Sequence, residues 1–253
     1  MEGRVTTTIK EHIAFISFFH PQSNSLPGVV LRMLANEIEL AGSHPEARVI
    51  VLQSEGEKSF CAGASFDELV SIENLEQGRH FFSGFAAVIN AIRKAPKFVI
   101  ARVQGKAVGG GVGIAAAADY TLATIQSSIK LSELAVGIGP FVVGPAVERK
   151  VGKSAFQQLA INATAWQTAE WSQAKGLYAE VFPSIPELDA AVISLAERLS
   201  VSSPEAMRLL KKVAWEGTDH WDTLLLERAE ISGTLVLSDF TRNAITSFKA
   251  GAR

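Results

Sequence analysis

The stretch Val103-Gln104-Gly105-Lys106-Ala107-Val108-Gly109-Gly110-Gly111-Val112-Gly113 carries the most informative pattern in the chain. It follows an apolar, β-rich run, Phe98-Val99-Ile100-Ala101, and it opens an Ala-rich segment that ends at Ala118. A strand, a glycine turn and a helix in this order place backbone N–H groups at a helix start, where small residues let a ligand approach closely. The helix dipole favours negative charge at that end. The stretch therefore predicts a turn that binds an anionic or oxyanionic group.

The same arrangement occurs once earlier in the chain. Phe60-Cys61-Ala62-Gly63-Ala64-Ser65 follows the apolar run Arg48-Val49-Ile50-Val51-Leu52 and precedes a helical pattern, and a later strand-like run leads to Leu131-Ser132-Glu133. A single glycine turn is equally compatible with tight packing of a helix on a strand. Two facing backbone donors would form an oxyanion hole, and one well-placed Glu could then move a proton. Together the three segments predict chemistry on a carbonyl group.

Composition excludes several classes of protein. The 253 residues include 24 basic and 26 acidic ones, so the chain lacks the basic field of a nucleic-acid binder. The single cysteine, Cys61, precludes an intrachain disulfide and fits a reducing compartment, and the five histidines show no metal-ligand spacing. Residues 1–10 lack the apolar segment of a signal peptide, and no apolar run is long enough to span a membrane. We expect a cytoplasmic protein without nucleic-acid or membrane partners and without a metal.

Hydrophobic periodicity predicts a layered α/β domain followed by helices. Residues 6–9 and 13–18 have the pattern of a β-hairpin. Strands are expected at 49–53, 98–103 and 120–124, alternating with helices at 29–41, 66–75, 78–94 and 111–118. After Pro140 the pattern is helical, at 144–151, 153–162, 168–175, 187–199, 204–215, 222–236 and 239–250. We expect an α/β core over residues 1–180 and a C-terminal helical part over residues 181–253.

In these segments the chain resembles the crotonase superfamily, also called the enoyl-CoA hydratase/isomerase family, over essentially its whole length. The resemblance lies in Ser59 to Ala64, Val103 to Gly111, Ala118-Asp119, and Leu131-Ser132-Glu133 with Gly137 and Pro140; Asn24-Ser25-Leu26 is similar to the family's early CoA-binding segment. The resemblance implies the ClpP/crotonase-like fold, a twisted β-core of repeated ββα units with C-terminal helices that form a homotrimer, often paired into a hexamer. It also implies an acyl-CoA thioester substrate and no cofactor, since coenzyme A enters with the substrate.

The resemblance assigns roles to individual residues. It implies that the backbone N–H groups of Ala62 and Gly110 hold the thioester oxygen and that Glu133 exchanges protons with water or carbon. The other substrate- and CoA-binding positions it implies are Ser25, Leu26, Gly63, Ala64, Ser65, Gly109, Pro140 and Phe141. The sequence around Glu133 is apolar (Leu131, Leu134, Ala135, Val136), and we expect these neighbours to raise its pKa toward neutrality.

Three positions depart from the family pattern. Gly113 stands where hydratases with two glutamates carry their other catalytic Glu; Ser65 stands where many relatives have Asp; and Phe141 stands where a small residue is common. Patterns with a single Glu occur in family isomerases and in a branch that looks like bacterial methylglutaconyl-CoA hydratases. We expect Phe141 to narrow the acyl pocket.

Three functions remain open at this stage. The first is reversible hydration of an α,β-unsaturated acyl-CoA, with a methylglutaconyl-type substrate as one possibility; the second is a double-bond isomerase that uses Glu133 alone. The third is an acyl-CoA-binding subunit without catalysis. Two further predictions concern structure: Asp119 braces the following strand, and the run Phe81, Phe82, Phe85 packs either in the core or along a substrate-binding helix.

Overall fold

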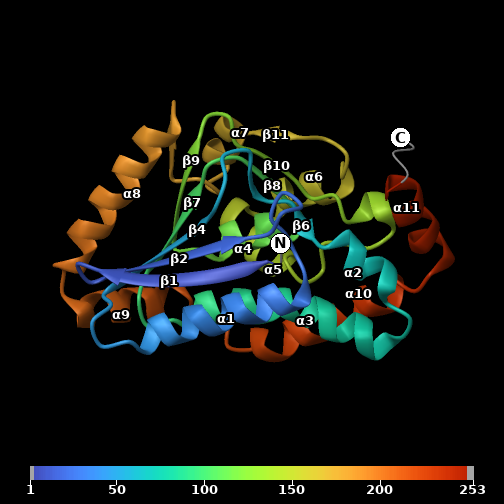
Figure 1. Cartoon of the computed structure of the whole chain (residues 1–253), viewed down its shortest axis with the longest axis horizontal. Helices are drawn as coiled ribbons and strands as arrows, with labels where there is room; N and C mark the ends of the chain where they lie inside the picture. Colours follow the sequence, from blue (N-terminus) through green and yellow to red (C-terminus); the bar gives the residue numbers. More distant parts are fainter. Residues whose placement is uncertain (1–2, 250–253) are drawn as a thin grey trace.

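A six-stranded sheet forms the centre of the molecule in the computed structural model, which describes residues 3–249 (Figure 1). Only the first strand is antiparallel to its neighbour; the others run parallel. The predicted hairpin and the three predicted strands are thereby confirmed. The strands lie in the order β1 (Arg4–Lys10), β2 (Ile13–Phe19), β4 (Val49–Ser54), β7 (Val99–Val103), β9 (Tyr120–Thr124) and β12 (Glu180–Phe182).

Each of the strands β4, β7 and β9 is followed by a short strand of a second sheet. These short strands are β5 (Ser59–Cys61), β8 (Lys106–Val108) and β10 (Ser128–Lys130), which run parallel to one another, with β11 (Gln167–Thr168) antiparallel at the edge. Helices α2 (Phe66–Ser71) and α3 (Leu75–Lys94) follow β5, and α4 (Gly110–Ala117) follows β8. The expected β-core of repeated ββα units is confirmed. A further pair, β3 (Ser25–Leu26) with β6 (Gly63–Ala64), links the N-terminal loop to the first glycine turn.

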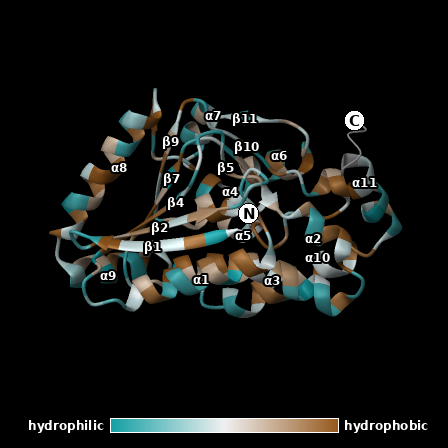
Figure 2. Cartoon of the chain, in the orientation of Figure 1, coloured by the Kyte–Doolittle hydropathy of each residue, from teal (hydrophilic) through white to brown (hydrophobic). Residues whose placement is uncertain are grey.

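Helices cover the two faces of the large sheet. Side chains of β2 and β4 alternate between the faces: Ile16 and Leu52 pack toward α1 (Gly28–Ser43), whereas Ile13 and Val51 pack toward α8 (Ile185–Ser200). In Figure 2, hydrophobic residues dominate the central strands, while the outer helices carry both hydrophobic and hydrophilic residues. Beyond α1, helices α3 and α10 (Trp221–Leu235) pack together so closely that a Cβ atom at Gly78 would lie 2.8 Å from Gly233 Cα. Glycines are therefore needed where these helices meet.

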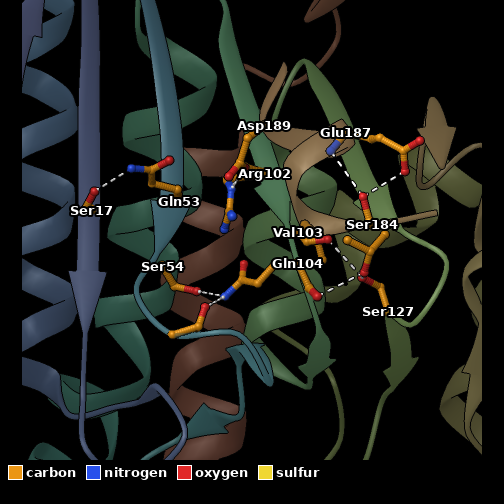
Figure 3. Close-up of polar contacts among 12 residues, drawn as sticks. Ser17, Gln53, Ser54, Arg102, Val103, Gln104, Ser127, Ser184, Glu187 and Asp189 are labelled. Carbon is orange, nitrogen blue, oxygen red and sulfur yellow. Dashed lines mark hydrogen bonds and ion pairs between the residues drawn. The ribbon is translucent and has the colours of Figure 1, made fainter. Parts of the chain in front are cut away.

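The helical part beyond residue 180 contributes to the sheet layer. β12 adds the last strand of the sheet, and α8 covers one of its faces, where the ion pair between Arg102 on β7 and Asp189 fixes it (Figure 3). The structure contains the other predicted helices as α5 (Gly144–Val151), α6 (Lys153–Ile161), α7 (Ala169–Ala174), α9 (Pro204–Ala214) and α11 (Asp239–Lys249); residue 250, predicted to end the last helix, lies outside the described residues.

Helix α2 ends four residues before its predicted end, whereas the others differ from prediction by no more than three residues at either end. The pattern predicted a helix to residue 75, but α2 ends at Ser71. The side chain of Asn74 accepts a hydrogen bond from the Gln77 amide and so caps α3. Because an N-cap residue is extended, the chain has to leave the first helix before Asn74.

Polar contacts fix the turns between the two sheets (Figure 3). The side-chain amide of Gln104, after β7, donates to the hydroxyl of Ser54 at 2.9 Å and to the carbonyl of Ser59 at 3.1 Å. Next to it, a Cβ atom at Gly105 would lie 2.6 Å from the carbonyl carbon of Lys58, so only glycine fits there. These contacts hold the starts of β5 and β8 side by side.

Asp119 has a structural role, as predicted, but among the described residues its carboxylate contacts the neighbouring strand β7 and residues near the end of α9 instead of the following strand, β9. Its carboxylate accepts hydrogen bonds from the amide of Val99 at 2.8 Å and the indole of Trp215 at 2.9 Å. The ammonium of Lys211, on α9, lies 2.8 Å from the same carboxylate and also donates to the carbonyl of Ile92. The buried ion pair thus joins α9 to the start of β7.

Candidate active site

Strand register brings the three predicted segments to one place. In the second sheet, Cys61 pairs with Ala107 and Val108 pairs with Lys130. The chain therefore leaves β5, β8 and β10 at the same edge, because all three strands run in the same direction. Crevices at the carboxyl ends of parallel strands are common ligand sites. The residues that follow these strands are Ala62, Gly109 and, after a two-residue link, Glu133.

A small cavity of about 70 Å³ lies at this edge. That is well below the roughly 300–1,000 Å³ of pockets that enclose drug-sized ligands. The predicted site residues that line it are Ala62, Gly63, Ala64, Gly109, Gly110, Glu133, Pro140 and Phe141. The other lining residues are Phe66, Leu69, Phe82, Phe85, Val108, Ser132, Val136, Ile138, Gly139, Val142, Val143 and Ser232. Glu133 is the only one of these residues with an acidic or basic side chain.

The glycines of the two turns are required by their geometry. Gly63 has φ +88°, and a Cβ atom there would lie 2.8 Å from the carbonyl oxygen of Val108, so the turns touch. Gly109 has φ +51° and lies at the start of α4. A Cβ atom at Gly110 would lie 2.5 Å from Cζ of Phe85, so the ring and the helix start share one surface. Small residues therefore expose backbone amides to the cavity.

The two predicted oxyanion donors differ in their present partners. The amide of Gly110, in the first position of α4, takes part in none of the turn, loop or cap hydrogen bonds between described residues. Such an amide has no partner within its helix. The amide of Ala62, by contrast, donates to the carbonyl oxygen of Ser23 at 3.2 Å. Gly110 therefore offers a free donor, whereas Ala62 must share or give up its bond to Ser23 to bind a ligand.

Glu133 projects its carboxylate into the interior of the site. Its Oε1 atom lies 3.0 Å from the position that a Cβ atom at Gly109 would take, and Oε2 is buried with no hydrogen-bond partner among the described residues. Burial raises the pKa of Glu133 from 4.5 to about 7, and a hydrogen bond from its own backbone amide opposes this. A carboxyl group with this pKa can take up and release a proton near neutral pH.

The raised pKa was expected, but its predicted cause is wrong in part. Leu134 and Ala135 are exposed, so they do not bury the carboxylate. Glu133 stands at the start of a short 3₁₀ turn, Leu134–Val136, which directs these two side chains outward. The desolvation comes from the cavity wall that the glycine turns and Val136 form with residues remote in sequence.

Position 113 is closed to any side chain. A Cβ atom at Gly113 would lie 2.6 Å from Cβ of Val143 and closer still to its Cγ1 atom. Val143 is 4% exposed and lines the cavity. The place where the resemblance puts a second catalytic Glu is therefore filled by a valine from another segment.

Three of the predicted CoA-binding residues lie outside the cavity lining. Ser25 and Leu26 pair with Gly63 and Ala64 in the two-stranded ladder, beside the first turn. Leu26 is fully buried in the core, and its carbonyl accepts a hydrogen bond from the Ser65 amide at 3.1 Å. The Ser25 hydroxyl is buried without a partner among the described residues. The Ser65 hydroxyl accepts a hydrogen bond from the Glu68 amide and caps α2, which is a structural role.

Other lining residues were not predicted, or only as alternatives. Phe81, Phe82 and Phe85 all pack in the core, which confirms the first alternative for this aromatic run, and Phe82 and Phe85 also line the cavity from α3. Ser232 comes from α10 and Val143 from the segment before α5. No local pattern marks the last two, because their place depends on how distant helices pack.

Comparison with known proteins decides the family. The model of the enoyl-CoA hydratase/isomerase family matches residues 8–232. The chain belongs to this family. Human mitochondrial methylglutaconyl-CoA hydratase is 32% identical over 222 residues, which cover 85% of this chain but only 65% of the human enzyme, just under two thirds of its length. The short-chain-enoyl-CoA hydratase of Clostridium acetobutylicum is 28% identical over 93% of this chain and 90% of its own length.

Solved structures agree with the crotonase fold. The crystal structure of an enoyl-CoA hydratase from Bacillus halodurans superposes with a TM-score of 0.88, covers 96% of this chain and 99% of its own, and is 21% identical. An enoyl-CoA hydratase from Mycobacterium avium subsp. paratuberculosis has a TM-score of 0.84 at 25% identity and covers 98% of this chain and 96% of its own. Within residues 3–249, no helix is both long and apolar enough to span a membrane.

Proposed function

We propose that this enzyme adds water reversibly to the double bond of a CoA thioester whose α,β-unsaturated acyl group is short and uncharged. The observation that carries the proposal is the position of Glu133, a buried carboxyl group with a pKa of about 7, in one cavity with both glycine turns. The family acts on acyl-CoA thioesters, and the matched hydratases support water as the second substrate.

The geometry supports a mechanism with one carboxylate. The amide of Gly110, joined by that of Ala62, would hold the thioester oxygen and stabilise the negative charge that develops there. The Glu133 carboxylate would take a proton from water as the water oxygen bonds to the β-carbon and the double-bond electrons move onto the thioester oxygen. The same carboxyl group would then give that proton to the α-carbon as the enolate collapses. One molecule of water is thereby added, and Glu133 returns to its starting form.

The lining of the cavity favours an uncharged acyl group. Besides Glu133 it contains aliphatic, aromatic and glycine residues and two serines, Ser132 and Ser232, and none of its residues is basic. A methylglutaconyl group carries one free carboxylate at the end away from the thioester, and this charge would face that of Glu133 with no cation in the lining to compensate it. The ring of Phe141 adds bulk to the lining beside Gly139, where a Cβ atom would lie 2.5 Å from it. We therefore propose a crotonyl-sized substrate.

A specific observation favours a second candidate, the double-bond isomerase. Val143 gives the wall an apolar surface where a second carboxylate would hold water, and a single Glu suffices to move a proton between two carbons. The dienoyl-CoA isomerase of Arabidopsis thaliana, 32% identical over 67% of this chain, is among the relatives.

Incubation in heavy-oxygen water distinguishes these candidates. Purified protein and its Glu133→Gln variant would be mixed with crotonyl-CoA, 3-methylglutaconyl-CoA or 3-hexenoyl-CoA, and the products followed by mass spectrometry. We expect ¹⁸O in 3-hydroxybutyryl-CoA, faster turnover of crotonyl-CoA than of 3-methylglutaconyl-CoA, and at least about 100-fold slower product formation with Glu133→Gln. Conversion of 3-hexenoyl-CoA to 2-hexenoyl-CoA without label would show the isomerase. Binding of all the esters without any product would show an acyl-CoA-binding subunit and overturn the proposal.

A further inference from the structure

Val143 and Gly113 form a close contact between two helices at the wall of the cavity. Gly113 lies in α4, one turn after Gly110, while Val143 directly precedes α5. We propose that Val143 determines which acyl chains the enzyme accepts, because it fills the volume that a side chain at position 113 would otherwise occupy. This inference rests on the proposed function, since it concerns the acyl group of the same substrate.

The contact leaves room for one side chain only. A Cβ atom at Gly113 would lie 2.6 Å from Cβ of Val143 and 3.4 Å from its Cα, so the clash ends only when Val143 loses its whole side chain. Because protein interiors are close-packed, α4 and α5 cannot move apart without disturbing their other contacts. Valine is also stiff at χ1, which makes it a fixed wall and not an adaptable one.

The direction of the contact explains why it affects the substrate. Residues three apart lie on the same face of a helix, so a side chain at 113 would lie on the face of α4 where a Cβ atom at Gly110 would meet the ring of Phe85, which lines the cavity. Val143 lines the cavity, whereas Gly113 is buried behind it. Removal of the Val143 side chain therefore lengthens the cavity on the α4 side, and a methyl group at position 113 fills it again from the opposite helix.

The test removes side-chain volume at position 143 and restores part of it at position 113. The kcat/KM values for crotonyl-CoA and 2-hexenoyl-CoA would be measured for the wild type, Val143→Gly, and Gly113→Ala/Val143→Gly. We expect Val143→Gly to shift the ratio at least tenfold toward the longer chain, which is the effect of about one methylene group in a fitted pocket. In the double variant the ratio should return most of the way to its wild-type value. An unchanged ratio in Val143→Gly, or a shift that Gly113→Ala does not reverse, would overturn the inference.

Two additions keep the inference testable on its own. Dissociation constants of butyryl-CoA and hexanoyl-CoA, measured by calorimetry, report the same preference without turnover, so a protein that fails as a hydratase still tests the role of Val143. Should Val143→Gly not fold, Val143→Ala gives a smaller shift in the same direction, because it keeps Cβ.

Thermal stability supplies the matched control. Gly113→Ala should lower the melting temperature of the wild type and lower it much less in the Val143→Gly background. Gly111→Ala, in the same helix, would place its Cβ atom 2.5 Å from the carbonyl oxygen of Cys61, away from Val143. Its loss of stability should therefore be the same in both backgrounds. Equal losses for Gly113→Ala in the two backgrounds would contradict the steric pairing.

Discussion

Glu133→Gln should make the folded protein more stable than the wild type at alkaline pH, while it lowers kcat strongly. The pKa of Glu133 is about 7 in the folded chain against 4.5 for the ordinary group. The folded state therefore favours the protonated form, so the contribution of this group to stability is greatest below pH 4.5 and is lost as the pH rises to about 7. The difference corresponds to about 3 kcal/mol of unfolding free energy at pH 8.5 and to less than about 1 kcal/mol at pH 5. Gln has no proton to lose and avoids this penalty.

The assay is thermal unfolding of both proteins at pH 5 and at pH 8.5. For a chain of this size, about 3 kcal/mol corresponds to a rise in melting temperature of about 6 °C or more, which should shrink to about a quarter of that value at pH 5. The exposed Glu216 supplies the control, since Glu216→Gln should change the melting temperature equally little at both pH values. An equal rise for Glu133→Gln at both pH values, or a fall at pH 8.5, would refute the reasoning that burial of the carboxylate raises its pKa. Loss of proton transfer should lower kcat by about 10²–10⁴-fold.

Further predictions concern pH and packing. The kcat/KM value should fall as the pH drops through about 7, because the ionised form of Glu133 accepts the proton; a midpoint near pH 4.5 would contradict this. Gly110→Ala forces Cβ against the Phe85 ring, and kcat should fall about 10²–10³-fold through displacement of the oxyanion donor, with a lower melting temperature. Lys211→Met removes the ammonium group that is paired with the Asp119 carboxylate at 2.8 Å and should lower the unfolding free energy by about 3–5 kcal/mol. Adding Asp119→Asn should recover part of that loss, and additive losses would show that the pair is not coupled.

The sequence sufficed for those parts of the site that follow a local pattern. Glycine turns after β-rich runs are local signals, so the two turns and Glu133 could be predicted to form one site, and the parallel strands β5, β8 and β10 bring them to one edge. The choice of Ala62 and Gly110 as donors came from the resemblance to the family. The contact of Val143 with Gly113 could not be predicted, because it joins segments thirty residues apart through the packing of α5 on α4.

The same limit explains the error about Glu133. The apolar residues that follow it in sequence were expected to bury it, but a 3₁₀ turn points two of them outward, and periodicity does not reveal a turn of three residues.

Ala62 shows a related limit. Its hydrogen bond to the Ser23 carbonyl depends on the loop before β3, where Ser23 and Asn24 have φ of +56° and +58°. Backbone conformations of this kind are rare outside glycine and leave no periodic trace in the sequence.

The absence of a side chain at position 113 and the raised pKa of Glu133 are linked through the apolar wall of the cavity. A second carboxylate at 113 would need space and solvation, and Val143 supplies neither, because it fills the space with an apolar wall. Glu133 is desolvated in that same cavity, and burial is the largest cause of its raised pKa. A carboxylate with an ordinary pKa would be a weak base at neutral pH and would leave the enolate without a ready proton, so two residues would be needed to share the work. A single carboxyl group with a pKa near 7 can accept the proton from water and return it to carbon, and an apolar wall in place of a second Glu helps to provide that pKa.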